Sequence, residues 1–456
     1  MARTTFAPVT DDALALFTDL YELTMMQGYV ETGHTPEATF SLFFRDLPTD
    51  RGYVVAAGLE QAVHYLEHLT FTDAALDYLA TQGFGDAVLD ALADFDFSGD
   101  VRALPEGTVV FPDEPLLEVT APIFEAQLFE TLLINQVGFQ SLVATKAARM
   151  REAVDRHGDD QTIVDFGSRR AHGTDAGLKA ARAAYLGGVT GTSNVAAGRA
   201  FDIPVFGTMA HSWVQSFPTE RAAFEAFVDV YGDESVLLVD TYDTVGGAET
   251  AAAVADERDV DIRGVRLDSG DLVALSKEVN DIVDCGIFVS SGLDEYAIAD
   301  FLTDGGVATG FGPGTALVTS KDAPTLDPVY KLVAVERDGE LAPTMKLSTG
   351  KVTYPGQKSV NRVERDGRFE RDVLAARDES APGEDQLVDV FEDGDLVYDL
   401  PGLDASRERA RRQRERLPEG TRALRDPDPY PVDVGDGLAS VTESLRADLA
   451  AEYTPE

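Results

Sequence analysis

Residues 265–282 read VRLDSGDLVALSKEVNDI, and this stretch decides the fold of the middle of the chain. It opens as a short apolar strand that stops at Asp268 and continues after Gly270 as an amphipathic helix. The apolar residues of that helix recur at helical spacing and are Leu272, Leu275, Val279 and Ile282. A strand that ends in polar residues and leads directly into a helix is the repeating unit of parallel sheets.

The same pattern recurs from residue 141 to residue 320. Four successive strand ends, at Asp240, Asp268, Ser291 and Gly312, lie 28, 23 and 21 residues apart, the length of a short strand plus one crossover helix. Earlier strands are expected to end at Asp165, Thr192 and Thr208. About seven such units favour an irregular βα barrel of the TIM type over an open doubly wound sheet. Either fold gathers functional groups at the carboxyl ends of its strands.

The rest of the chain has a different texture. Residues 1–140 mix short strands with helices, including a helix expected over 124–137, and predict an N-terminal α+β domain. Residues 321–365 contain strands expected to return to that domain. Residues 366–456 form a charged C-terminal region, in which the run 407–416 predicts a helix with a solvated face, because its glutamates oppose a site for an anionic partner.

Composition excludes several classes of protein. With 38 Lys and Arg against 81 Asp and Glu, the net charge of −43 is too acidic to hold nucleic acid or an anionic membrane by charge. The 44% of hydrophobic residues predicts a globular chain. No segment approaches the roughly 18 apolar residues of a membrane span, and the lone Cys285 excludes an intrachain disulfide or a thiolate zinc cluster. We therefore expect a soluble cytoplasmic protein.

Lysine is scarce and unevenly distributed. The chain has eight lysines, and an acidic, lysine-poor surface suits a high-salt cytoplasm, which predicts a halophilic source, an archaeon. Five of the eight lie between residues 321 and 358, which suggests positions that need an ammonium group or else a basic strand face. They are Lys321, Lys331, Lys346, Lys351 and Lys358.

Polar residues at the strand ends predict phosphate and metal chemistry. Carboxylates at Asp240 and Asp268 suit Mg²⁺, which needs only one or two protein ligands when substrate phosphates supply others. Asp243 and Asp271 fit helix N-caps as well as they fit metal ligands. His211 follows a strand end in GTMAHS, where a functional and a structural role are equally open.

Glycine-rich turns and two arginines extend the phosphate prediction. The loop from Gly310 to Thr315 and the turn from Ser290 to Gly292 let backbone N–H groups approach an anion, although glycines also make ordinary turns. Arg169 and Arg170 suit a carboxylate or a phosphate, with surface ion pairs as the alternative, and Phe166 offers a stacking face. These residues together predict a phosphate-handling enzyme that depends on Mg²⁺.

Six segments, in this order, resemble the nicotinate phosphoribosyltransferase family of type II phosphoribosyltransferases. They are TDLYELTM (18–25), DFGSRRA (165–171), GTSN (191–194), GTMAHS (207–212), VRLDSGD (265–271) and GFG (310–312). The resemblance implies that nicotinate and phosphoribosyl pyrophosphate form nicotinate mononucleotide and pyrophosphate, with Mg²⁺ and coupled ATP hydrolysis. It also implies a homodimer with shared active sites.

The resemblance assigns roles to individual residues. Phe166 and Tyr21 would sandwich the pyridine ring, with Tyr21 reaching from the neighbouring subunit. His211 would be phosphorylated by ATP, and Arg169 would sit near the nicotinate carboxylate or the phosphates. Arg266 and Asp268 would hold the ribose and the pyrophosphate, and Asp240 and Asp268 would hold the metal. The 5′-phosphate would be cradled by Ser291, Gly292, Gly312, Gly314 and Thr315.

Asn194 bears on the choice of pyridine. Related nicotinamide enzymes have aspartate at this place, and asparagine removes a like-charge contact with the carboxylate of nicotinate. The alternatives are a nicotinamide phosphoribosyltransferase and a noncatalytic sensor of pyridine ligands. The charged tail beyond about residue 365 matches no motif of the resemblance.

Overall fold

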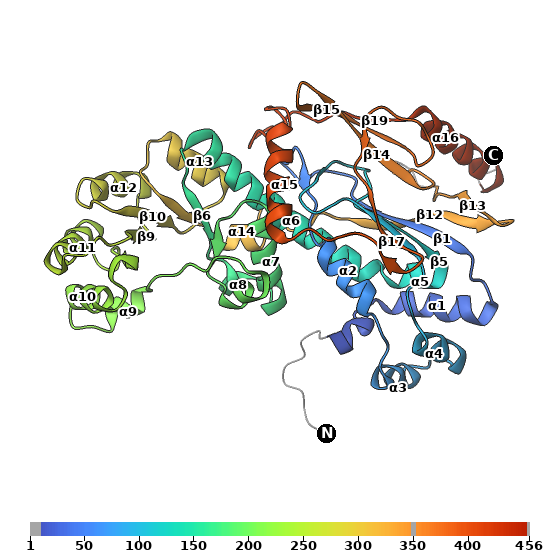
Figure 1. Cartoon of the computed structure of the whole chain (residues 1–456), viewed down its shortest axis with the longest axis horizontal. Coiled ribbons are helices and arrows are strands. Elements are labelled where there is room, and N and C mark those ends of the chain that lie inside the picture. The colour runs from blue at the N-terminus through green and yellow to red at the C-terminus, as the bar shows by residue number, and fades with distance from the viewer. Residues whose placement is uncertain (1–10, 348–352, 454–456) are drawn as a thin grey trace. The chain divides into compact units, whose positions relative to one another are not determined.

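The computed structural model describes residues 11–347 and 353–453. The chain forms two compact units (Figure 1). The parallel-sheet unit comprises Leu142–Pro324 with Leu424–Asp426. The strand-rich unit comprises the described residues within Met1–Ser141, Thr325–Ala423 and Pro427–Glu456. Among the described helices, none is both long and apolar enough to cross a membrane.

A six-stranded parallel sheet forms the centre of the parallel-sheet unit, in the order β7-β6-β11-β10-β9-β8. Its strands are β6 (Thr162–Asp165), β7 (Gly191–Thr192), β8 (Val236–Leu238), β9 (Gly264–Leu267), β10 (Gly286–Ser290) and β11 (Gly310–Gly312). Ile163, Leu237, Val265 and Val289 are fully buried, as expected for strands covered on both faces. The prediction of an α/β protein with a parallel sheet is confirmed.

Each strand leads into one or more helices. They are α7 (Thr174–Leu186), α8 (Val195–Phe201), α9 (His211–Gln215), α10 (Glu220–Tyr231), α11 (Thr244–Arg258), α12 (Leu272–Asn280), α13 (Glu295–Thr303) and α14 (Thr315–Val318), with 3₁₀ turns η2 (Ser168–Arg170) and η3 (Gly232–Glu234). Asp243 caps α11 by accepting from the Gly246 amide, and Asp271 caps α12 by accepting from the Ala274 amide. For these two aspartates the capping interpretation is confirmed.

The strand expected to end at Thr208 is reduced to a single bridge. Val205 pairs in parallel with Thr192, and no longer strand is present there among the described residues. Pro204 lies directly before Val205 and has no amide hydrogen to donate to a ladder, which limits pairing at this point.

The strand-rich unit contains three sheets. Their orders are β13-β12-β1-β5-β3-β17-β18, then β16-β14-β15-β19, then β2-β4. The strands are β1 (Glu37–Phe43), β2 (Val54–Val55), β3 (Asp100–Ala103), β4 (Val109–Val110), β5 (Leu117–Pro122), β12 (Val329–Arg337), β13 (Glu340–Pro343), β14 (Lys358–Arg365), β15 (Arg368–Ala376), β16 (Glu384–Asp385), β17 (Val388–Glu392), β18 (Asp395–Leu396) and β19 (Val432–Val434). Strand β12 pairs antiparallel with β1.

The helices of this unit differ in two places from the sequence prediction. They are η1 (Asp11–Leu16), α1 (Leu20–Thr32), α2 (Leu59–His68), α3 (Asp73–Thr81), α4 (Asp86–Ala93), α5 (Ile123–Leu128), α15 (Leu403–Arg416) and α16 (Asp436–Tyr453), while α6 (Glu130–His157) begins here and continues into the other unit. The prediction of a single helix over 124–137 is wrong, because the helix is interrupted at Phe129. The ring of Phe129 packs edge-on against Tyr65, Phe95 and Phe97. The helix expected over 407–416 exists, but it is only partly solvated, since Arg414 is buried.

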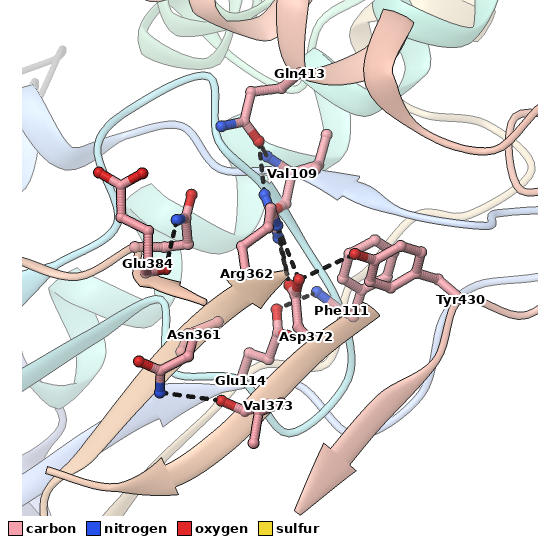
Figure 2. Close-up of polar contacts among 12 residues, drawn as sticks. Val109, Phe111, Glu114, Asn361, Arg362, Asp372, Val373, Glu384, Gln413 and Tyr430 are labelled. Carbon is pink, nitrogen blue, oxygen red and sulfur yellow. Dashed lines mark hydrogen bonds and ion pairs between the residues drawn. The ribbon is translucent and has the colours of Figure 1, made fainter. Parts of the chain in front are cut away.

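A buried cluster of charged and polar side chains holds β14, β15 and α15 together (Figure 2). Arg362 and Asp372 are direct partners across the β14–β15 ladder, and the guanidinium donates to both oxygens of the carboxylate at 2.5–3.2 Å. Arg362 also donates to the Gln413 side chain at 2.7 Å and to the Val109 carbonyl at 2.9 Å. The Tyr430 hydroxyl donates to Asp372 at 3.0 Å. The side chains of Arg362 and Asp372 are 1% and 0% exposed, so the polar contacts of these two side chains come from the protein.

Candidate active site

A cavity of about 640 Å³ opens at the carboxyl ends of the parallel strands. Its wall is formed by segments that follow β6, β7, β9, β10 and β11, together with residues 207–210. Of the residues expected from the sequence, those lining the cavity are Phe166, Arg169, Arg170, Arg266, Asp268, Ser291, Gly292, Gly312, Gly314 and Thr315. The parallel strands thus bring together residues that are up to 149 positions apart, because the chain returns to the same edge of the sheet after each helix.

The turn after β6 presents Phe166 to the cavity. Asp165 is fully buried and accepts hydrogen bonds from the Gly167 amide at 2.7 Å and from the Thr192 hydroxyl at 2.8 Å. Burial raises the pKa of Asp165, and these two hydrogen bonds offset part of that rise. A Cβ on Gly312 would lie 2.5 Å from the Phe166 ring, so glycine at 312 leaves the room that the ring occupies beside β11.

Three arginines line the same cavity, Arg169, Arg170 and Arg266. Arg266, at the end of β9, has an Nε atom that is buried and has no hydrogen-bond partner among the described residues. Burial lowers the pKa of Arg266 and the nearby Arg169 lowers it further, while Asp268 and Asp240 oppose both effects. Two like charges close together with an unused donor form a site that an anion would stabilise.

Asp268 lies at the centre of the polar contacts on the β8–β10 side. Its carboxylate accepts from the Ser290 hydroxyl at 2.6 Å and lies 3.8 Å from His211 Nε2. The backbone amide of Asp268 donates to Asp240 Oδ2 at 2.9 Å. Asp240 Oδ1 is buried and has no partner among the described residues. The other ring nitrogen of His211, Nδ1, lies 3.2 Å from the Thr241 hydroxyl, which orients the imidazole.

The turn after β10 has a conformation suited to a close approach by a ligand. Ser291 has a φ of 79°, which is rare for a residue with a side chain, and Gly292 follows with a φ of 64°. The next helix, α13, is already capped, because Asp294 accepts from the amides of Tyr296 and Ala297. An anion at this turn would therefore be bound by the backbone of 291–293 and not by the first turn of α13.

Four expected site residues are not among those that line the cavity. His211 and Asp240 are two of them, and they reach the site through their contacts with Asp268. The other two are Asn194 and Tyr21. Asn194 caps α8: its side-chain oxygen accepts from the Ala197 amide at 3.1 Å and its nitrogen donates to the Gly177 carbonyl at 3.3 Å. Tyr21 belongs to the strand-rich unit, where it lies on α1 with 44% exposure and hydrogen-bonds Glu130. Burial and that hydrogen bond raise the pKa of Tyr21.

Some lining residues were not assigned a role from the sequence. Lys321 and Asp294 line the cavity, as does Ser168, whose hydroxyl is buried without a partner among the described residues. The clustering of scarce lysines pointed to Lys321, but it pointed equally to Lys358, which is buried in the strand-rich unit and lies 2.9 Å from Glu118. Lys351 lies outside the described residues.

The fold and the cavity define an α/β protein with an arginine-lined cavity at the carboxyl ends of a parallel sheet. Family models narrow this class: residues 16–138 match the nicotinate phosphoribosyltransferase N-terminal domain, residues 161–394 the nicotinate phosphoribosyltransferase family, and residues 383–442 the C-terminal domain. The chain belongs to the nicotinate phosphoribosyltransferase family.

Individual relatives agree with this membership. The chain is 47% identical to nicotinate phosphoribosyltransferase pncB2 of Mycobacterium tuberculosis, over 97% of this chain and 96% of that protein. It is 39% identical to the Bacillus subtilis nicotinate phosphoribosyltransferase, over 93% and 94%. The crystal structure of human nicotinic acid phosphoribosyltransferase superposes with a TM-score of 0.82 at 31% identity, covering 94% of this chain and 99% of that one. The charged tail, which matched no motif of the resemblance, belongs to the family's C-terminal domain up to residue 442.

Proposed function

We propose that this protein transfers the phosphoribosyl group of phosphoribosyl pyrophosphate to nicotinate, giving nicotinate mononucleotide and pyrophosphate in NAD salvage. The observation that carries the proposal is the anion site: the buried, unpartnered Arg266 Nε with Arg169 beside it in one cavity. The carboxylate of nicotinate and the phosphates of phosphoribosyl pyrophosphate carry the negative charges that would pair with these two guanidinium groups. The relatives' names support the choice of substrate.

In the proposed reaction, the nicotinate nitrogen forms a bond to the anomeric carbon as the bond from that carbon to pyrophosphate breaks. Phe166 would hold the pyridine ring by stacking, and Arg169 would hold its carboxylate or the phosphates. Arg266 would bind the departing pyrophosphate, while the turns at 291–292 and 312–315 hold the 5′-phosphate. This work is orientation and charge neutralisation, and it needs no covalent intermediate on the protein.

The carboxylates of the site fit Mg²⁺. Asp240 offers a buried oxygen without a partner, and Asp268 lies beside it, while no group of three or more metal-binding side chains occurs in the described part of the chain. Two carboxylates suffice for Mg²⁺ when the substrate phosphates complete its octahedron. When bound, the ion would neutralise pyrophosphate charge.

We propose that ATP drives the synthesis through phosphorylation of His211. A ring nitrogen would attack the γ-phosphorus of ATP, forming an N–P bond as the bond to ADP breaks. The contact of Nδ1 with Thr241 supports Nε2 as the free nitrogen, and this nitrogen faces Asp268. We expect His211→Ala to lose the stimulation of turnover by ATP and to keep some uncoupled synthesis. Unchanged ATP consumption per nucleotide in that variant would contradict the assignment.

The choice of pyridine is best tested directly. Nicotinate and nicotinamide would each be supplied with phosphoribosyl pyrophosphate and Mg²⁺, with and without ATP, in molar KCl and in dilute buffer. We expect ATP-stimulated product from nicotinate alone, with best activity in molar KCl because of the net charge of −43. Turnover of nicotinamide would favour the nicotinamide enzyme. Binding of nicotinate without release of pyrophosphate would favour the sensor.

The same proposal includes the finer architecture. We infer that the parallel sheet curls into an irregular barrel, because residues 205–208 link its two edge strands. Val205 bridges Thr192 of β7, and the Thr208 hydroxyl donates to the Val236 carbonyl of β8. We propose four parts of the chain, residues 1–140, 141–320, 321–365 and 366–456. The pairing of β12 with β1 supports the return of the strands in 321–365 to the N-terminal part.

We further propose a cytoplasmic homodimer in which Tyr21 completes the neighbouring site. The exposure of Leu20 at 64% and of Tyr21 at 44% supports a subunit contact on this stretch of α1.

A further inference from the structure

A buried ion network lies directly behind the cavity, within the parallel-sheet unit. Lys146 on α6 places its Nζ 2.5 Å from Glu295 Oε2 and 2.5 Å from Asp322 Oδ1. One turn further along α6, Arg149 Nε donates to Glu295 Oε1 at 2.8 Å. The side chains of Lys146, Arg149 and Glu295 are 1%, 2% and 0% exposed, whereas Asp322 is 36% exposed. Two positive and two negative charges thus balance inside the unit.

Both carboxylates are joined through the backbone to residues that line the cavity. Glu295 directly follows the turn 291–294, whose four residues all line it. Asp322 directly follows Lys321, which lines it as well. Lys146 therefore ties two walls of the cavity to one another without being one of the lining residues itself.

Both segments that carry these carboxylates contain a residue with an unfavourable backbone conformation, which the ion pairs can help to hold. Ser291 at a φ of 79° and Ser320 at a φ of 40° flank the two attachment points, and both conformations are unfavourable for residues with side chains. Burial alone would raise the pKa of Glu295, but Lys146 and Arg149 outweigh burial and keep that pKa below its usual value. Glu295 is thus a carboxylate held between two cations, which fixes its backbone at the start of α13.

A short segment of the C-terminal region completes the network. Arg149 Nη2 donates to the Leu424 carbonyl at 2.8 Å and to the Tyr296 hydroxyl at 3.1 Å. The guanidinium of Arg425 lies 4.7 Å from the centre of the Tyr296 ring, and the same group lies 3.4 Å from Asp300. Leu424 therefore contacts α6 and Arg425 contacts α13, which gives this part of the charged tail a structural task.

A buried ion pair by itself says little about stability, since an apolar replacement of similar volume is often neutral. What distinguishes this network is that each of its two carboxylates directly follows, along the chain, a residue that lines the cavity. We propose that Lys146 and Glu295 are positioning residues for the reaction proposed above, setting the backbone of 291–294 and the place of Lys321 so that both meet the phosphates of phosphoribosyl pyrophosphate. This inference rests on the proposed function and deepens it.

The test compares two buried lysines. Lys146→Met removes the ammonium group of the network. Lys358→Met is the matched control, because Lys358 forms a buried ion pair with Glu118 in the strand-rich unit, and these two side chains are 2% and 3% exposed. Binding of phosphoribosyl pyrophosphate would be followed by calorimetry without nicotinate, and steady-state kinetics would give KM for each substrate. We expect Lys146→Met to weaken phosphoribosyl pyrophosphate binding about tenfold or more and to leave the KM for nicotinate within about twofold. Lys358→Met should lower the Tm and leave both substrates unaffected.

The outcomes separate the inference from the proposed function. Wild-type protein that binds no phosphoribosyl pyrophosphate would overturn the proposed function and this inference with it. If wild type and Lys146→Met bind phosphoribosyl pyrophosphate equally well, the inference is overturned but the proposed function stands. An equal loss of binding in Lys146→Met and Lys358→Met would have the same meaning. If Lys146→Met does not fold, Asp322→Asn removes one of its two carboxylate contacts at a partly exposed position, and it must still show a selective rise in the KM for phosphoribosyl pyrophosphate.

Discussion

The two units contain arginine–aspartate clusters of opposite character. In the strand-rich unit, Arg362 and Asp372 have their hydrogen bonds supplied by the protein and lie out of reach of water. In the parallel-sheet unit, Arg266 and Asp240 have buried atoms that find no partner among the described residues, and Asp268 lines an open cavity. The same residue types thus stabilise a fold where their contacts are closed and prepare a site where contacts are left unmade. Mutations in the two clusters should have opposite consequences.

The largest effect is expected on stability, from Arg362→Met. This change leaves Asp372 as a buried charge without its main partner, which costs about 3–5 kcal/mol of unfolding free energy. Denaturant unfolding followed by circular dichroism measures the loss. The double variant Arg362→Met with Asp372→Leu should recover part of it, and a single variant as stable as wild type would contradict the closed character of the cluster.

Arg266→Met should do the reverse. Loss of one preorganised donor to a leaving group lowers kcat/KM by about 100-fold to 1,000-fold. Its Tm should not fall, because burial already disfavours the charge of Arg266. Turnover and thermal unfolding of the same preparation check both parts. A fall in Tm with activity intact would make Arg266 a structural arginine.

Phe166→Ala sharpens the picture of the open site. Stacking of a base on an aromatic ring is worth about 1–3 kcal/mol, so the KM for nicotinate should rise between about fivefold and 150-fold. The KM for phosphoribosyl pyrophosphate should change little. An unaltered KM for nicotinate would remove Phe166 from the pyridine site.

The last effect is a pH dependence in the closed cluster, which is small near pH 4.3 and grows as the pH rises. Glu114 is fully buried beside Asp372, and burial followed by the charge of Asp372 raises its pKa well above the usual value. One oxygen of Glu114 accepts from the Phe111 amide at 2.9 Å, and the other is buried with no hydrogen-bond partner among the described residues, which favours a protonated carboxyl beside the charge of Asp372.

A carboxyl whose pKa is higher in the folded protein contributes its full stabilisation at pH values below its pKa in the unfolded chain, about 4.3. That contribution is lost as the pH rises through the pKa of the folded state. Glu114→Gln keeps a donor toward Asp372 at every pH. Relative to wild type it should therefore gain about 1.4 kcal/mol of unfolding free energy per pH unit above roughly pH 4.3. A constant difference between the two proteins from pH 4 to pH 8 would show that Glu114 is not protonated in the fold.

The sequence predicted the open site better than the closed one. Strand ends meet at one edge of any parallel sheet, so Asp165, Asp268 and Gly312 could be grouped before the fold was known. The Arg362–Asp372 pair depends on the antiparallel register of β14 and β15, which spacing along the chain does not specify.

Other misses have particular causes. Asn194 had the chemistry of a specificity residue, but a residue before a helix also fits a cap, and the cap is what its side-chain contacts form. The network of Lys146 and Arg149 left a faint signal, two cations spaced by three residues within the otherwise apolar stretch LVATKAARM of α6. Their partners lie about 150 or more positions away and follow only from the fold.

The most direct test of the account is binding of phosphoribosyl pyrophosphate, measured by calorimetry in Mg²⁺ and molar KCl, to wild type, Arg266→Met and Arg362→Met. The temperature would be one at which circular dichroism shows all three folded. The account predicts wild-type affinity for Arg362→Met and a loss of about 100-fold or more for Arg266→Met. Equal affinity of Arg266→Met and wild type would contradict the claim that the cavity of the parallel-sheet unit is the site of phosphoribosyl transfer.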